Sequence, residues 1–188
     1  MSAARAARTG ESAAQSVAGA DWAALPASIR AIHDGAEAVG EGEVVGGETA
    51  LLRALGRILG FPRPAERVAI SLRVEQDFRG ELWRRRFGAQ RLDTRVDVRG
   101  GLFAERFRGV ELRFALRATP LGLVFEQRRA ALACGPLRLP LPAALAPKIA
   151  AHDEPGPSDG SVRFSVVLSL WGLRLVGYAG LVTPGDLE

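Results

Sequence analysis

The sequence has very few of the residue types that commonly carry chemistry. Its 188 residues include one cysteine, two histidines, one tyrosine and one methionine. A single cysteine excludes a disulfide framework, and an apolar content of 47% excludes wholesale disorder. No uncharged run is long enough for a membrane-spanning helix, and the first twenty residues lack the apolar core of a signal peptide. These absences predict a soluble, cytoplasmic protein.

Lysine is also nearly absent, because Lys148 is the one lysine among 25 basic residues and the others are arginines. The net charge is +4 and the sequence pI is about 10.4. The arginines are interleaved with 21 acidic residues along most of the chain. A nucleic-acid surface needs basic residues gathered on one face, so we do not predict nucleic-acid binding.

Motifs for catalysis, cofactors and metals are missing as well. The glycines of residues 40–45 fail as a dinucleotide loop, because Val45 stands at the third glycine position and the segment follows a predicted helix. His33 and His152 lack the further ligands that a metal site needs. Cys134 is a lone thiol, more typical of a small buried apolar side chain. We therefore assign no catalytic residue, metal or cofactor, and whether the chain is an enzyme stays open.

The N-terminal part predicts a tail and two helices. Residues 1–20 show no hydrophobic period and predict a disordered tail before one domain over residues 21–184. A first helix begins near Asp21 or at the Leu25–Pro26 step. A second covers Leu51–Leu59, where Gly60 is suited to a left-handed cap.

After Pro64 the hydrophobic period changes to two, which indicates β-strands separated by short turns. The predicted strands lie at about residues 68–75, 81–87, 91–98, 102–107, 110–117, 121–133, 162–170 and 173–182. Residues 143–151 predict a short helix, followed by a solvated polar loop from His152 to Gly160. This order predicts an α+β fold, namely a strongly curved antiparallel meander of about eight strands, forming a half-barrel or open barrel with two N-terminal helices packed on it.

Two of the predicted strands carry an aromatic–charge–aromatic triplet on one face. The triplets are Trp83, Arg85 and Phe87, and Phe103, Glu105 and Phe107. A charge flanked by aromatic rings is desolvated, and an unpaired buried charge is costly, so we predict an Arg85–Glu105 pair. The outer strands of a three-strand unit lie about 10 Å apart, a gap that arginine and the small Thr94 between them can close.

We interpret these triplets as a concave, aromatic-lined ligand site. Its predicted ligand-binding residues are Trp83, Arg85, Phe87, Phe103, Glu105, Phe107 and Tyr178. The Tyr178 hydroxyl either belongs to this site or is a satisfied polar tip in the core. The alternative to a site is an Arg–Glu pair on the solvent face, overhung by the aromatic rings.

Several of these residues also resemble a known family. The matching segments are Trp83-x-Arg85-x-Phe87-Gly88, Glu105-x-Phe107, Pro140-Leu141-Pro142-x-x-Leu145-x-Pro147, Phe164-x-Val166 and Tyr178-x-Gly180-Leu181. Together they resemble domain of unknown function 4166, a bacterial family, over residues 25–183. The chain departs from the family pattern at Arg108–Gly109, where the glycine comes one position later. The resemblance implies no catalytic residue.

Three functions follow as hypotheses. The first is an uncharacterised binding or accessory domain that holds an apolar or amphipathic, lipid-like small molecule on a concave sheet face. The second is a substrate-contacting component of a separately encoded NAD(P)-dependent oxidoreductase, because the resemblance implies relatives fused to saccharopine-dehydrogenase-like domains. The third is a structural domain without a ligand.

Overall fold

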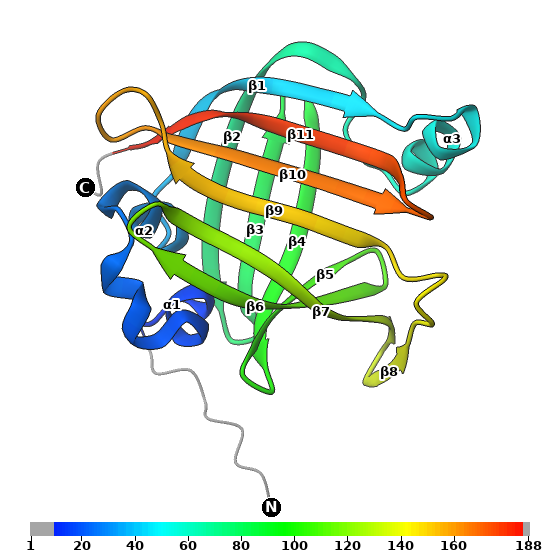
Figure 1. Cartoon of the computed structure of the whole chain (residues 1–188), viewed down its shortest axis with the longest axis horizontal. Helices are drawn as coiled ribbons and strands as arrows, with labels where there is room; N and C mark the ends of the chain where they lie inside the picture. The colour runs from blue at the N-terminus through cyan, green and yellow to red at the C-terminus, as the bar shows by residue number, and fades with distance from the viewer. Residues whose placement is uncertain (1–9, 186–188) are drawn as a thin grey trace, which may run out of the picture.

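The computed structural model describes residues 10–185 and shows an antiparallel β-barrel (Figure 1). Ten strands close the barrel in the order β1-β2-β3-β4-β5-β6-β7-β9-β10-β11, and β8 adds to the outer end of β7. The strands are β1 Ala38–Gly46, β2 Ala65–Asp77, β3 Gly80–Phe87, β4 Gln90–Arg99, β5 Leu102–Phe107, β6 Val110–Thr119, β7 Gly122–Cys134, β8 Leu137–Pro140, β9 Lys148–Pro155, β10 Val162–Leu170 and β11 Leu173–Pro184.

Helices lie at both ends of the barrel. α1 (Ala13–Ala18), the 3₁₀ helix η1 (Gly19–Ala24) and α2 (Ala27–His33) gather at one end, and α3 (Ala50–Ile58) lies at the other (Figure 1). Trp22, Ile29 and Ile32 from the first group are buried against the strands, so this end of the barrel is closed. Within residues 10–185, no helix has the length and apolar character needed to cross a bilayer.

The predicted meander of about eight strands was therefore too short, and the expected half-barrel is a closed barrel. β1 was missed because Gly40 and Gly42 suggest a turn. In the barrel these glycines lie where β1 meets β11, and a Cβ on either one would collide with the backbone of Leu181 or Ala179. β9 was missed because residues 143–160 suggest a helix followed by a loop. These two strands complete the ring on both sides of the β10–β11 hairpin.

The expected N-terminal tail is ordered in part. Residues 1–9 lie outside the described residues, but α1 begins before the predicted boundary at residue 21. The Ser12 hydroxyl accepts a hydrogen bond from the Gln15 amide as its N-cap, and the Glu81 carboxylate accepts one from the Ala13 amide. Ala13 and Ala14 are buried. Small side chains give little hydrophobic signal in the sequence, yet they allow α1 to pack closely on the barrel.

The helix predicted at Leu51–Leu59 agrees better with the structure. α3 lies within the predicted 51–59 segment to within a residue, and Gly60 follows it with φ +73°.

The Arg108–Gly109 turn has positive φ at both residues and joins β5 to β6 with Phe107 opposite Val110. This two-residue turn matches the twist of the strands it connects. The register of β6 is thereby fixed.

Candidate functional site

The barrel encloses a cavity of about 320 Å³ whose wall is largely apolar. Aliphatic and aromatic side chains from nearly every strand line it, together with Ile29 and Ile32 of α2 and Leu55 of α3. Period-two alternation explains this wall, since every second side chain of a barrel strand points inward. The few polar groups in the wall therefore stand out chemically.

The central polar group is a three-residue network across β3, β4 and β5. Arg85 Nη1 donates hydrogen bonds to Thr94 Oγ1 at 2.9 Å and to Glu105 Oε1 at 3.0 Å. The Thr94 hydroxyl donates to the same carboxylate oxygen at 2.7 Å. The Arg85 guanidinium also lies over the Trp83 ring, 4.9 Å from its centroid. The predicted Arg85–Glu105 pair is thus present, and Thr94 bridges its two members.

This network leaves two hydrogen-bond donor atoms of Arg85 unused. Among the described residues, Arg85 Nε and Nη2 have no hydrogen-bond partner. Neither atom is fully buried, so both remain accessible within the cavity that Arg85 lines. Burial opposes the charge of Arg85, but the attraction and hydrogen bond to Glu105, together with Tyr178 and Asp153, outweigh it, and the pKa of Arg85 is raised. The guanidinium therefore remains a charged donor inside the cavity.

Tyr178 adds a second polar group to the wall. Its ring packs edge-on against Phe87, with 5.1 Å between the centroids. Burial raises the pKa of the Tyr178 hydroxyl to about 12, although the charge of Arg85 opposes this shift. None of the described residues forms a hydrogen bond with this hydroxyl, and the side chain lines the cavity. The hydroxyl is therefore a neutral group that is free to donate or accept.

Sequence reasoning missed a further polar pair, His33 and Asp153. Nε2 of His33, at the end of α2, lies 2.9 Å from Oδ2 of Asp153 on β9, and both residues line the cavity. Nδ1 of His33 is buried without a hydrogen-bond partner among the described residues. The stretch from His152 was expected to be a solvated loop, which was wrong, because β9 continues to Pro155. Alternation in β9 turns Asp153 inward and leaves His152 exposed.

All seven residues of the predicted site line this one cavity. Phe103 contacts Trp83 edge-on at a centroid distance of 5.9 Å, and Phe61 from the segment after α3 packs on Phe107 at 5.0 Å. The alternative of a solvent-facing Arg–Glu pair is wrong, because Arg85 and Glu105 point into the barrel.

Within residues 10–185 we find no group of three potential metal ligands.

The cavity is closed at one end and open at the other. At the α2 end, the lining residues Ile29, Ile32 and His33 are buried. At the α3 end, Leu132 of β7 and Leu145 of the β8–β9 connection also line the cavity but are exposed. A molecule entering from solvent therefore meets these two leucines first.

The fold and cavity define a class, a closed antiparallel barrel with an apolar interior that contains a few paired polar groups. The chain belongs to the family described as domain of unknown function DUF4166, whose model matches residues 25–182. Among curated proteins we found no match.

Among solved structures, the chain is similar to a protein of unknown function from the DUF3598 family of Nostoc punctiforme. The two share 11% sequence identity with a TM-score of 0.42. The similarity covers 80% of this chain but 47% of the Nostoc chain, so this chain spans about half the length of that protein.

Proposed function

We propose that the barrel binds one small amphipathic molecule, with its apolar body against the aromatic and aliphatic wall and an oxygen-bearing head at Arg85. A carboxylate or hydroxyl head suits the guanidinium, whose Nε and Nη2 are unused. The Tyr178 hydroxyl is the second candidate partner for this head. The proposed ligand-binding residues are Trp83, Arg85, Phe87, Phe103, Glu105, Phe107 and Tyr178.

The observation that carries this proposal is a charged donor with free hydrogen-bonding positions inside a predominantly apolar cavity. A purely structural Arg–Glu pair tends to have its donors satisfied, because an unmet buried donor costs about 1–3 kcal/mol. Ligand pockets typically have volumes of about 300–1,000 Å³ and combine apolar walls with a few polar groups. The cavity, at about 320 Å³, falls at the lower end of that range.

The pairing of Arg85 with Glu105 also limits the chemistry of the head group. Glu105 accepts two hydrogen bonds at Oε1, so the Arg85 charge is already balanced without a ligand. A polar head can then add hydrogen bonds at Nε and Nη2 with no need for a full negative charge. Alcohols and carboxylates of the same chain length are therefore both suitable test molecules.

The test is native mass spectrometry of the purified protein, followed by titration with decanoate, decanol and decane. We expect a co-purified amphipathic species, and tighter binding of decanoate and decanol than of decane. The double variant Arg85→Met/Glu105→Leu removes both charges together, which avoids leaving one of them unpaired in the cavity. The double variant is expected to weaken the binding of decanoate and decanol by about tenfold or more, with little effect on the binding of decane.

A matched control is available on the same strand. Arg84→Met changes an arginine that faces outward and donates to Glu75, so binding of all three molecules is expected to stay unchanged. Equal binding of decanol and decane to the native chain, or no binding of any of them, would contradict the proposal.

A further inference from the structure

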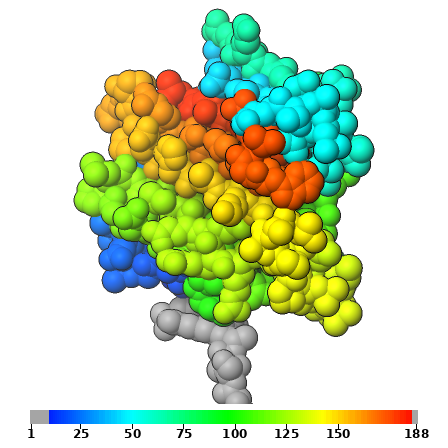
Figure 2. Space-filling model, turned by 45° about the vertical axis from the view of Figure 1, so that its right-hand side comes forward, coloured from blue at the N-terminus to red at the C-terminus, as the bar shows by residue number. Residues whose placement is uncertain are grey.

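The open end of the barrel exposes more large apolar side chains than the closed end, where Phe78 and Leu121 are exposed on turns. Three separate segments contribute to the open end, namely α3, the residues from 135 to 147 that include β8, and the β10–β11 turn. Their exposed apolar side chains are Leu51, Ile58, Leu137, Leu139, Leu145 and Trp171. Figure 2 shows the three segments side by side on one face of the molecule. We call these six side chains the apolar rim.

The rim includes one of two strained turns. Trp171 and Arg108 are the two non-glycine residues with positive φ among residues 10–185, at +57° and +47°. Both occupy the first position of a two-residue hairpin turn, where asparagine or glycine is usual. Trp171 is also 60% exposed, whereas Trp22 and Trp83 are buried. Trp171 therefore combines two unfavourable features at the tip of a hairpin. Its backbone has a positive φ, and its large aromatic ring is exposed to water.

Charge is divided between the two ends of the barrel. The connections at the open end, with β8, contain Arg53, Arg57, Arg63, Arg108 and Arg138, against the single carboxylate of Glu48. The described connections at the closed end, with α1, η1 and α2, contain more acidic than basic residues. The five acidic residues are Glu11, Asp21, Asp34, Glu37 and Asp159, and the two arginines are Arg30 and Arg79. All the open-end arginines except Arg138 are exposed. The rim is thus set in a positive field, whereas the opposite end is negative.

We propose that the open end of the barrel docks on the surface of an anionic lipid bilayer. The apolar rim enters the interfacial region, and Arg53, Arg57, Arg63 and Arg108 meet the lipid phosphates. Apolar side chains next to basic ones are the combination that favours binding at an anionic interface. Docking in this orientation turns the cavity opening toward the lipid, which supplies or receives an amphipathic ligand. The docking proposal depends on the apolar rim and on the arginines around it. The transfer of a ligand between lipid and cavity also depends on the proposed function.

A bilayer fits this surface better than a folded partner or a nucleic acid does. The rim side chains come from three segments around an opening, so they offer no continuous groove for a helix or strand. A nucleic acid would meet the arginines but leave the rim leucines and Trp171 exposed to water. A bilayer supplies phosphates and an apolar phase at adjacent depths, which matches both features.

The test is co-sedimentation of the full chain with vesicles of phosphatidylcholine alone and of phosphatidylcholine containing about one third phosphatidylglycerol. We expect binding to the anionic vesicles and little to the neutral ones. Raising the salt from about 0.1 M to about 1 M shortens the Debye length from about 10 Å to about 3 Å, so binding should fall. Because Trp22 and Trp83 are buried, a blue shift of tryptophan emission on binding reports on Trp171.

The variants compare the two ends of the barrel. Leu51→Ser/Ile58→Ser changes two exposed rim residues of α3 and should weaken vesicle binding by about tenfold or more. The control is Phe78→Ser, which changes a side chain that is 91% exposed on the β2–β3 turn at the closed end and should leave binding unchanged. Circular dichroism checks that both variants stay folded.

Absence of binding to the anionic vesicles overturns the docking proposal, as does equal binding to neutral vesicles. An equal loss of binding with Phe78→Ser overturns the assignment to the open end. The titration with decanol uses no vesicles, so it tests the cavity separately. Vesicle binding without decanol binding would support the docking surface and contradict the proposed ligand site.

Discussion

Arg85 and Glu105 show how single residues shape the interior of the barrel. Moving either charge alone out of water costs several kcal/mol, so the two are tolerated inside because they neutralise each other. Thr94 is small enough to let them meet across the intervening strand, and its hydroxyl donates a second hydrogen bond to the carboxylate oxygen that Arg85 contacts. The pair also fixes the relative register of β3, β4 and β5, since a one-residue slip would turn one partner outward.

Tyr178 offers a direct measurement at the residue scale, because it is the single tyrosine of the chain. Its pKa is raised to about 12 from an ordinary value of 10.0 by burial. An absorbance titration near 295 nm should therefore show one transition close to pH 12. The neutral hydroxyl contributes stability that is complete below pH 10 and is lost as the pH rises through 12. A midpoint near pH 10 in the folded protein would show that the hydroxyl is exposed to water.

Among the polar pairs in the cavity, Arg85–Glu105 could be predicted from the sequence, whereas His33–Asp153 could not. Alternation within β3 and β5 placed Trp83, Arg85 and Phe107 on the inner face, and opposite charge predicted the pair. His33 and Asp153 are separated by 120 positions, and the sequence gives no sign that the end of α2 meets β9. Their contact depends on how α2 closes the barrel.

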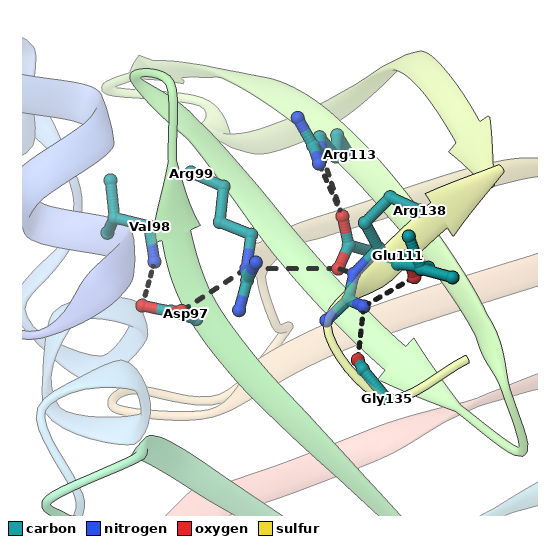
Figure 3. A network of polar contacts seen from close by, with 8 residues as sticks. Asp97, Val98, Arg99, Glu111, Arg113, Gly135 and Arg138 are labelled. Atoms are coloured by element: carbon teal, nitrogen blue, oxygen red, sulfur yellow. Dashed lines mark hydrogen bonds and ion pairs between the residues drawn. The ribbon is translucent and has the colours of Figure 1, made fainter. Parts of the chain in front are cut away.

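At the scale of elements, β8 is attached to the barrel through a buried carboxylate (Figure 3). Glu111 on β6 points outward yet is 0% exposed, because arginines from three strands cover it. Arg113 Nη2 lies 2.7 Å from Oε1, and Arg138 Nε of β8 donates to Oε2 at 2.7 Å. Burial opposes ionisation of Glu111, but these hydrogen bonds outweigh it, and the pKa of Glu111 is lowered.

Glu111→Gln is expected to destabilise the protein by about 3 kcal/mol at pH 7, because it leaves the surrounding arginines without their shared counter-charge. A lowered pKa gives stability that is present above the unfolded value of 4.5 and is lost as the pH falls through the folded value. The difference from the native chain should therefore shrink below about pH 4.5. Urea unfolding at several pH values measures both effects.

The matched control is Glu126→Gln on neighbouring β7. The Glu126 carboxylate pairs with Arg117 and Arg128 but is partly exposed, so the expected loss is about 0.5 kcal/mol or less. Equal losses for the two variants would show that the Glu111 network has no special stabilising role.

At the scale of the whole molecule, closure is the decisive feature. β1 pairs with β11 over nine residues, and β6 pairs with β7, so all ten ring strands have a partner on both sides. A closed ring leaves no free edge and keeps the cavity wall continuous. In an open half-barrel, one side of the cavity would be solvent, and Arg85 would be exposed to bulk water.

A chain ending at Gly172 tests this closure, because it removes β11 and leaves β1 and β10 with free edges. We expect no cooperative unfolding transition for this chain, together with aggregation through the free edges. The control chain ends at Gly185, which keeps β11 complete, and it should unfold like the full protein. A cooperative transition for the shorter chain would show that the barrel does not depend on closure.

Local features could be predicted from the amino-acid sequence, because they depend on periodicity and on nearby residues. These features include α3 with its Gly60 cap, the inner and outer faces of most strands, and the Arg85–Glu105 pair three strands wide. The closure through β1 and β9, the contact of His33 with Asp153, and the gathering of apolar and basic residues at one end became visible in the folded chain. These depend on pairing between distant segments, and such pairing leaves no periodic trace in either segment.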